Sequence, residues 1–322
     1  MRTELALLAV SLCFTPFCVD AQVPVMQGPV TQGPVSQGPS TQDLLWEKTT
    51  ARIAAIAARL DGVMGVSIVD LTDGRSFVLH ADQLFPAAST IKLPLLLELY
   101  RQEQDGRAGV PGLARLLDRY TFDRADLVDD SRIMAGLTPN ISVLTNRDLA
   151  QCMVAVSDNA ATNVLIRRVG MERVNAMLRA QGLMQTMLRR RMIDIAAARR
   201  GDENIATPQE FTRLLEAIWK GKILNAELTQ AYLQQLSTTK PSHIPRLLPS
   251  GVRVANKSGE LDGVRADVGI VYAAHRPFAM SVMTAMNRDD QAAEVAIGEV
   301  ALAAYRYFSM VGTTSVYGRI MP

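Results

Sequence analysis

The chain has 322 residues, of which 48% are hydrophobic, so it can bury a substantial core in one large domain or two ordinary ones. Its 34 basic residues nearly balance its 32 acidic ones, and no long run of lysine or arginine occurs. This balance gives no reason to expect nucleic acid or a membrane surface as a partner, and it favours a small molecule or a neutral polymer.

Residues 1–21 have the pattern of a cleaved secretory signal. An apolar run follows Arg2 and ends in small residues at a predicted cleavage site after Ala21. A membrane anchor needs about 20 apolar residues, whereas this run is shorter and is interrupted by Pro16. We therefore expect a secreted or periplasmic protein without stable membrane insertion.

Residues 22–42 repeat a short Gln-Gly-Pro pattern that is too rich in proline and glycine to form a core. We expect an extended tether here, a folded domain over 43–308 and a C-terminal tail over 309–322. After removal of the signal only Cys152 would remain, so no intramolecular disulfide is expected. The histidines are scattered without paired ligand spacing, and we expect neither a metal nor another cofactor.

The folded domain begins with an amphipathic pattern that predicts a helix over 45–60. Thr-Asp-Gly at 72–74 then predicts a hairpin between strands at 65–71 and 75–80. A second strand-rich block and a final helix are predicted near the C-terminus, with strands at 252–257, 266–273 and 278–285 and the helix at 290–306.

The segment between these blocks, from about 90 to 236, is helical in pattern. One helix start is clear, because Thr207 can act as the cap, a proline follows it, and Glu210 stands three residues after the cap. The early and late strands must bury their apolar faces together. We therefore expect one α/β lobe from 43–88 and 237–308, an inserted all-helical lobe of about 89–236, and a site in the cleft between them.

Ser89 precedes a strongly apolar helical segment, so it should lie at the N-terminus of a buried helix, beside exposed N–H groups. Lys92 falls on the same face one turn later, where partial burial would lower its pKa and let it accept the hydroxyl proton. On its own, this Ser-x-x-Lys motif is explained more simply by a capping serine and a surface lysine.

The triplet Ser-Asp-Asn at 157–159 opens another helical stretch, and a helix cap again explains the triplet taken alone. The functional alternative makes Ser157 a proton relay and lets the amide of Asn159 orient a substrate carbonyl. In that alternative Asp158 is a structural anchor for the turn.

The triplet Lys-Ser-Gly at 257–259 ends a predicted strand. Strand alternation can direct Lys257 into a cleft, while Gly259 permits a close backbone approach. The N–H groups of Glu260 and Ser89 could then form an oxyanion hole. Taken alone, the triplet also fits a strand that ends at a surface turn.

The order of the three motifs is more informative than any one of them. At average amino-acid usage, a Ser-x-x-Lys sequence arises about once by chance in a chain of this length, and the other two roughly a tenth as often or less. Helix caps and strand ends explain each motif separately, but they do not explain the order.

In this order the motifs resemble those of the class A serine β-lactamases and the related penicillin-binding D,D-peptidases. The resemblance covers roughly residues 43–308 and implies an α/β fold in which helices flank an antiparallel sheet, an α/β/α sandwich, with an inserted helical lobe. It implies acyl transfer from a β-lactam or a peptidoglycan-like acyl-D-Ala substrate. Ser89 would be the acylated nucleophile, Lys92 its activating partner, and Ser157 the donor of a proton to the leaving nitrogen.

The resemblance also implies binding roles. Asn159 would hold the substrate amide, and Lys257 with Ser258 would bind the substrate carboxylate. Glu260 is a departure from the family, because its charge would weaken carboxylate binding unless it points away or pairs with Arg265. Arg265 could itself bind the carboxylate, or it could be an exposed arginine at a strand end.

A second departure lies in the loop before the Thr-Pro helix start, where class A enzymes carry a glutamate that activates the hydrolytic water. Counting back from Thr207 without gaps places Arg191 at that position. Asp194 is the nearest carboxylate and could replace the glutamate if the loop is rebuilt, although its side chain is one methylene shorter. Asp202 and Glu203 are expected to anchor the loop by pairing with nearby arginines.

The leading hypothesis is a secreted β-lactamase that acts through an acyl-enzyme on Ser89. The missing glutamate supports an alternative, a D,D-peptidase or penicillin-binding serine hydrolase with slow deacylation, although the chain lacks large extra domains. A non-catalytic binding module is disfavoured by the intact Ser89, Lys92, Ser157 and Lys257. No coiled-coil heptads are evident, so we expect a monomer.

Overall fold

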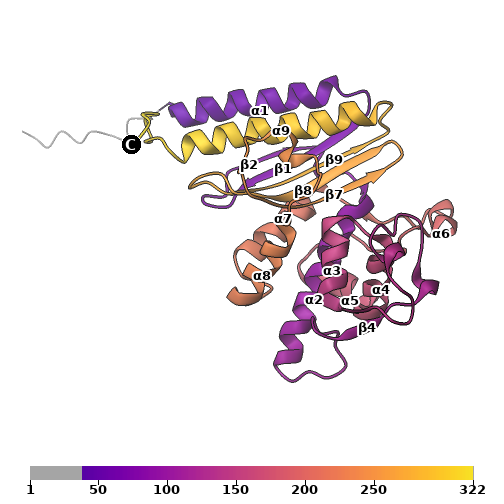
Figure 1. The fold of residues 1–322 in the computed structure, drawn as a ribbon. Coiled ribbons are helices and arrows are strands. Elements are labelled where there is room, and N and C mark those ends of the chain that lie inside the picture. The colour runs from indigo at the N-terminus through magenta and orange to yellow at the C-terminus, as the bar shows by residue number, and fades with distance from the viewer. Residues whose placement is uncertain (1–37, 322) are drawn as a thin grey trace, which may run out of the picture. The chain divides into compact units, whose positions relative to one another are not determined.

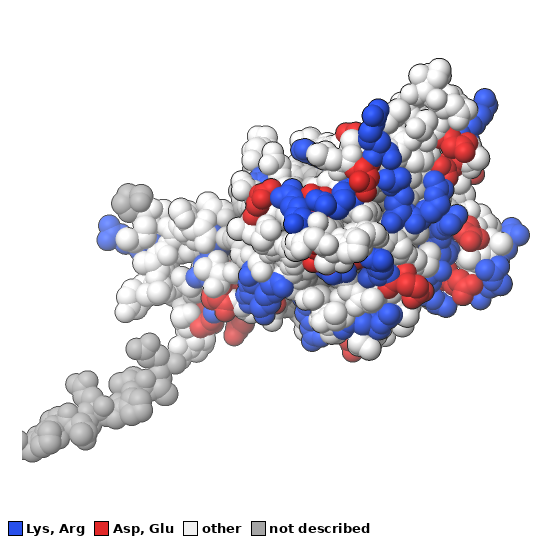
Figure 2. Space-filling model, turned by 90° about the horizontal axis from the view of Figure 1, so that it is seen from below, with Lys and Arg blue, Asp and Glu red and all other residues white. Residues whose placement is uncertain are grey.

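The computed structural model describes residues 38–321, so the predicted signal and most of the predicted tether lie outside the described residues. Residues from Pro39 onward form one compact unit. No helix in residues 38–321 is both long enough and apolar enough to cross a membrane. Figure 2 shows acidic side chains lying among the basic ones over the face seen from below.

A five-stranded antiparallel sheet brings the two ends of the described chain together, in the order β2-β1-β9-β8-β7 (Figure 1). The expected hairpin and the expected C-terminal strands all belong to this sheet. The strands are β1 (Val63–Asp70), β2 (Ser76–Leu79), β7 (Val254–Leu261), β8 (Val264–Val271) and β9 (Phe278–Ala285). Strand β7 lies at an open edge of the sheet, which leaves its outer backbone groups free for other partners.

Helices α1 (Thr41–Arg59) and α9 (Asp290–Val311) pack side by side over one face of the sheet (Figure 1). Fully buried Ile53, Val282 and Ile297 form part of the core in this layer. The opposite face is covered by α7 (Pro208–Trp219) and by the remaining helices. The predicted fold class, an antiparallel sheet flanked by helices with a helical lobe, is therefore confirmed.

The helical lobe is built from helices that follow β3 (Phe85–Pro86) and the 3₁₀ helix η1 (Ala88–Ile91). Its helices are α2 (Lys92–Arg107), α3 (Asn146–Ala155), α4 (Asn159–Val169), α5 (Met171–Ala180) and α6 (Ile195–Arg199). Helix α8 (Ala226–Leu236) packs against α2 and β7. Three short strands complete the lobe: β4 (Arg119–Thr121) pairs with β5 (Val143–Thr145), and β6 (Ile205–Ala206) pairs with β3. Three further 3₁₀ helices are η2 (Arg124–Asp126), η3 (Met134–Gly136) and η4 (Ile244–Leu247).

The predicted lobe division needs a correction at α7, which falls inside the range of about 89–236 but packs on the sheet. The hydroxyls of Thr212 on α7 and Ser67 on β1 are 2.7 Å apart and fully or almost fully buried. Gly65 on β1 makes room for Pro208, because a Cβ there would lie 2.9 Å from the proline ring. Helix α7 therefore belongs to the α/β lobe.

The ends of two helices also differ from the predicted boundaries. Helix α1 begins at Thr41 rather than at residue 45, because Ser40 forms a capping box with Asp43. Helix α9 continues past 306 to Val311, because Phe308 and Val311 still face the core. The predicted tail over 309–322 is therefore helical at its start.

Candidate active site

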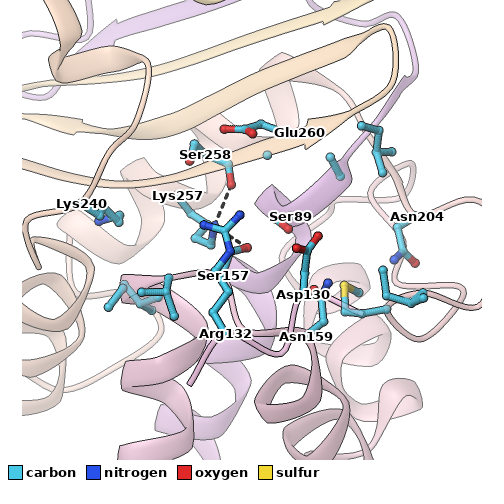
Figure 3. Close-up of a pocket in the computed structure, with 18 of the residues that line it drawn as sticks. Ser89, Asp130, Arg132, Ser157, Asn159, Asn204, Lys240, Lys257, Ser258 and Glu260 are labelled. Carbon is cyan, nitrogen blue, oxygen red and sulfur yellow. Dashed lines mark hydrogen bonds between the residues drawn. The ribbon is translucent and has the colours of Figure 1, made fainter. Parts of the chain in front are cut away.

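A cavity of about 380 Å³ contains residues from all three sequence motifs. Ser89 comes from η1, Ser157 and Asn159 from the start of α4, and Lys257 and Ser258 from β7. These side chains point toward one another in Figure 3. The expected cleft therefore lies where the edge strand β7 meets η1 and the α3–α4 turn.

Ser89 is partly exposed in a sharp turn that leads into α2. The preceding Ala88 has a φ of +47°, a left-handed conformation that is uncommon for a residue with a side chain. No hydrogen-bond acceptor for the Ser89 N–H lies within residues 38–321. The expected position beside a free helix N-terminus is thus found, with a 3₁₀ turn in place of the first α-helical turn.

Gly259 lets β7 approach the backbone at Ser89. A Cβ added at Gly259 would lie 2.8 Å from the Ser89 nitrogen and 3.0 Å from the Thr90 nitrogen, distances that real Cβ atoms hardly ever show. Backbone atoms in a packed turn cannot move aside as a flexible side chain can. The close approach predicted for this glycine is therefore present.

The backbone of Glu260 points out of the sheet edge toward the same turn. Its partner on β8 is Arg265, whose N–H and C=O groups both bond to the Thr284 hydroxyl on β9. Because backbone polar groups alternate sides along an antiparallel strand, those of Glu260 must face away from β8. The N–H groups of Glu260 and Ser89 are therefore both available to stabilise an oxyanion.

Lys92 is buried, with 1% of its surface exposed, and its ammonium group is held by the second motif. Its Nζ lies 2.7 Å from the Ser157 carbonyl oxygen, 3.0 Å from Ser157 Oγ and 2.8 Å from Asn159 Oδ1. Burial lowers the pKa of Lys92 well below its ordinary value, and the charge of Lys257 lowers it further. A neutral Lys92 has a lone pair, so it can accept a proton.

Ser157 links two lysines. Lys92 Nζ lies 3.0 Å and Lys257 Nζ 3.2 Å from its hydroxyl oxygen, and its φ of +59° is again left-handed. The neighbouring Asp158 holds this turn in place, because its carboxylate accepts bonds from the N–H groups of Ala161, Ile133 and Met134. Asp158 is fully buried and is the anchor that the sequence predicted.

Lys257 is 2% exposed and donates to the Ser258 carbonyl oxygen at 2.7 Å. Burial, followed by the charge of Lys240, lowers the pKa of Lys257 to about 7. Burial likewise lowers the pKa of Lys240 to about 8. Near neutral pH this wall of the cavity is therefore only partly protonated when it holds no anion.

The loop over 189–204 differs from what counting along the sequence suggested. Arg191 is exposed, whereas the side chain of Met192 is buried and lines the cavity. Both backbone groups of Met192 bond to the amide of Asn163 on α4. The side chain that this part of the loop directs into the cavity in place of the expected glutamate is therefore the apolar Met192.

Asp194 does not line the cavity, although residues on both sides of it do. Its carboxylate accepts a bond from the Ala197 N–H at 2.9 Å and caps α6. The predicted role of Asp194 as a hydrolytic base thus finds no support in its position. A short helix needs a cap, and the aspartate just before its first residue supplies one.

Asp202 and Glu203 anchor the loop, as predicted. Glu203 accepts from Arg190 at 2.7 Å, and Asp202 lies 3.4 Å from both Arg189 and Arg200. Glu203 also lines the cavity, but its carboxylate is engaged by Arg190.

Arg265 does not reach the cavity, and the proposal that it binds a carboxylate is corrected accordingly. It lies 3.0 Å from Glu294 and 3.3 Å from Asp290, both on α9. Nor does it pair with Glu260, whose Oε1 instead lies 3.7 Å from Nε2 of His243. The Glu260 side chain is 58% exposed, so much of its charge is solvated.

Sequence reasoning missed several cavity residues, chiefly Asp130, Arg132, Asn204 and Lys240. They come from irregular segments between the motifs and have no characteristic spacing, so no local pattern identified them. In the described residues no group of histidine, cysteine and acidic side chains is arranged to hold a metal ion.

Comparison with known proteins gives the family of this site. A model of the β-lactamase enzyme family matches residues 48–308, which is most of the chain. The chain belongs to the class A β-lactamase family. This family member is 25% identical to β-lactamase SME-1 from Serratia marcescens over 262 residues, which cover 79% of this chain and 86% of that protein.

Solved structures agree with this membership. The crystal structure of a β-lactamase from Sphaerobacter thermophilus matches with a TM-score of 0.72 and 32% identity, covering 81% of this chain and 97% of that one. PBP-A matches with a TM-score of 0.72 and 25% identity, covering 81% and 96%. A PBP-A mutant solved as an acyl-enzyme complex with penicillin G matches with a TM-score of 0.71. This chain is therefore a serine hydrolase of the β-lactamase family.

Proposed function

We propose that this enzyme opens β-lactam rings by forming an acyl-enzyme on Ser89. The observation that carries the proposal is the position of the Ser157 hydroxyl. It lies within hydrogen-bond distance of two buried lysines, Lys92 and Lys257. Burial lowers the pKa of both lysines. A lysine whose pKa is lowered in this way can be neutral and accept a proton, which acylation requires.

In the proposed acylation, Ser89 Oγ attacks the lactam carbonyl and its proton passes to neutral Lys92. The carbonyl oxygen becomes an oxyanion, which the N–H groups of Ser89 and Glu260 stabilise. The C–N bond then breaks, and Ser157 gives its proton to the departing nitrogen while Lys92 replaces that proton. Protonated Lys257 binds the substrate carboxylate beside this nitrogen.

Release of the acyl group needs a base that activates water. A carboxylate can serve only if it reaches the water attacking the ester, and Glu203 is engaged by Arg190 while Asp194 caps α6. These positions favour a second candidate, a penicillin-binding D,D-peptidase-type hydrolase with slow deacylation. The likeness to PBP-A agrees with that candidate.

Two measurements test the proposal and separate the candidates. Mass spectrometry after incubation with benzylpenicillin should show an adduct on Ser89 that is absent from Ser89→Ala. Steady-state turnover of a chromogenic cephalosporin should then follow acylation. A single burst without turnover would contradict β-lactam hydrolysis and favour the second candidate, and no adduct at all would contradict both.

Replacing Asp194 tests the remaining role that the sequence suggested for it. Because its carboxylate caps α6, we expect Asp194→Asn to leave the deacylation rate within about twofold of wild type, since asparagine is also a good cap. The lifetime of the acyl-enzyme, followed by mass spectrometry, is the measurement. A trapped acyl-enzyme in this variant would identify Asp194 as the base after all.

A further inference from the structure

Three cationic side chains that line the cavity have no acidic partner. Arg132, Lys240 and Lys257 all lie at its wall, yet none forms an ion pair with a carboxylate in residues 38–321. Arg190, in contrast, lines the same cavity and is paired with Glu203. Lys240 donates to the carbonyl oxygens of Leu236 and Thr238, and Lys257 to that of Ser258, but these neutral acceptors leave the positive charges unbalanced and able to attract an anionic ligand.

The three cations come from separate segments but lie close together. Arg132 belongs to the loop before η3, Lys240 to the connection between α8 and β7, and Lys257 to β7. The charge of Lys240 lowers the pKa of Lys257, and the charge of Arg132 lowers the pKa of Lys257 and of Lys92. Lys257 therefore lies within range of the charges of both Arg132 and Lys240, and an anion bound beside it would relieve the repulsion that it experiences.

The cations lie on the side of the site that receives the leaving group. In Figure 3, Lys240, Lys257 and Arg132 lie on the same side of Ser89, and Asp130 lies next to Ser89 on the other side. Ser157, which donates to the leaving nitrogen in the proposed acylation, lies within 3.2 Å of Lys257. The part of the substrate that carries the leaving nitrogen therefore lies beside the cations.

The nearby carboxylates do not neutralise this group of cations. Glu260 is the acidic residue of the cavity wall whose charge acts on Lys257, but its side chain is 58% exposed and faces His243. Asp130 acts on Lys92 and is itself exposed. Asp267 also acts on Lys257, but its carboxylate is fully buried and accepts bonds from the N–H groups of His243 and Ile244. One substrate carboxylate can bind Lys257 and Ser258, and Arg132 and Lys240 then still have no anionic partner.

We propose that Arg132 and Lys240 form a second anion subsite, so that the preferred substrate carries two carboxylates on the side of its leaving nitrogen. This inference rests on the proposed acylation of Ser89, because the leaving-group side is defined by that reaction. The substrate class is a β-lactam with a second carboxylate on its ring substituent, or a peptide that ends in a D-amino dicarboxylic acid.

The test compares two cephalosporins that are identical except that the 3-substituent ends in a carboxylate in one and a neutral carboxamide in the other. We expect wild type to be acylated roughly tenfold faster by the carboxylate, which corresponds to one charge-assisted hydrogen bond of about 1.4 kcal/mol. In the double variant Arg132→Gln/Lys240→Gln the ratio of the two rates should fall to about one. Taking a ratio within each variant cancels any general loss of folded enzyme.

Matched controls are Arg124→Gln and Lys222→Gln, which replace exposed cations outside the cavity and should keep the wild-type ratio. A ratio near one in wild type, or an unchanged ratio in the double variant, would overturn the subsite. If neither cephalosporin acylates wild type, the proposed function fails instead. Calorimetric binding to Ser89→Ala then still decides, because equal affinities would overturn the subsite and tighter binding of the dicarboxylate would support it.

Discussion

At the scale of single residues, the chemistry of this site depends on one serine hydroxyl that lies between two lysines. Ser157 has this position because its left-handed backbone turns the hydroxyl between Lys92 and Lys257. Both lysines are almost fully buried, so removal from water lowers the pKa of each. Proton transfer at this site therefore depends on burial and on the spacing of the three polar atoms.

Gly259→Ala tests how closely β7 must approach the Ser89 turn. The new Cβ would lie 2.8 Å from the Ser89 nitrogen, so the strand and the turn must separate. We expect the acylation rate to fall about 100-fold, the effect of a small misplacement of reacting groups. Stopped-flow acylation measures it, with Gly136→Ala as control because a Cβ there meets nothing within 4 Å. An acylation rate within a few-fold of wild type would contradict the geometry described for Gly259.

The pH dependence of acylation tests Lys257. Its pKa is lowered to about 7, so its positive charge is lost as the pH rises through that value. We expect the second-order acylation rate constant for a carboxylate-bearing β-lactam to fall on the alkaline side of pH 7, because this constant reports groups of the free enzyme. In Lys257→Arg the cation persists and this alkaline decrease should disappear. The same decrease in Lys257→Arg would assign the titration to another group.

At the scale of single elements, the residues at the start of α7 fix the position of the segment before the cavity loop. Thr207 caps α7 by accepting the Glu210 N–H, as the sequence predicted. Glu210 does not complete a capping box; its carboxylate instead accepts from the N–H groups of Gln185 and Thr186. The first turn of α7, a helix that packs on the sheet, therefore also holds the segment that leads into the cavity loop.

Thr207→Ala should lower the free energy of unfolding by about 1 kcal/mol, because the first turn of α7 loses its side-chain acceptor. Urea unfolding followed by circular dichroism measures the change. Thr50→Ala is the comparison, since its hydroxyl bonds within α1 at the surface and alanine favours helices. Equal effects of the two substitutions would mean that the cap contributes nothing beyond the loss of a hydroxyl.

At the scale of the whole molecule, the sheet brings three distant chain segments to one cavity. Strand β7 has an open edge, the 3₁₀ helix η1 that leads into α2 packs against it, and the helical lobe supplies the α3–α4 turn. Buried lysines from two of these segments, and Lys240 from the connection before β7, then meet in one place. Their joint burial should affect the stability of the whole fold.

The free energy of unfolding should rise from about pH 7 toward pH 9. The folded chain has Lys257 with a pKa of about 7 and Lys240 with a pKa of about 8, whereas both are near 10.4 when unfolded. In this range the unfolded chain binds more protons, so stability increases with pH. Above about pH 9 the trend should weaken, because burial raises the pKa of Cys152 to about 11 and the unfolded thiol ionises first.

Urea unfolding at a series of pH values measures this dependence. Lys240→Met removes one of the buried-lysine contributions, which include that of Lys92, with little change of volume, so its curve should rise less steeply than that of wild type. Lys222→Met, an exposed position, should leave the slope as in wild type. A wild-type stability that stays flat or falls between pH 7 and pH 9 would contradict the lowered lysine pKa values.

The sequence alone determined the family, the sheet strands and the residues that form the acylation site. Ser89 and Lys92 are one helical turn apart, and the other two motifs stand at the ends of regular elements, so local spacing was sufficient to recognise them. Local periodicity also located the principal strands and the start of α7. These features depend on residues that are near one another along the chain.

Only the tertiary structure decided the rest. In the structure α7 packs on the sheet, and Asp194 caps α6. Arg265 pairs with α9, while Arg132 and Lys240 line the cavity. Each of these outcomes depends on which segments pack together in three dimensions or on the course of an irregular loop. Hydrophobic periodicity and short sequence motifs do not indicate such contacts, because the contacts form only when distant segments pack together.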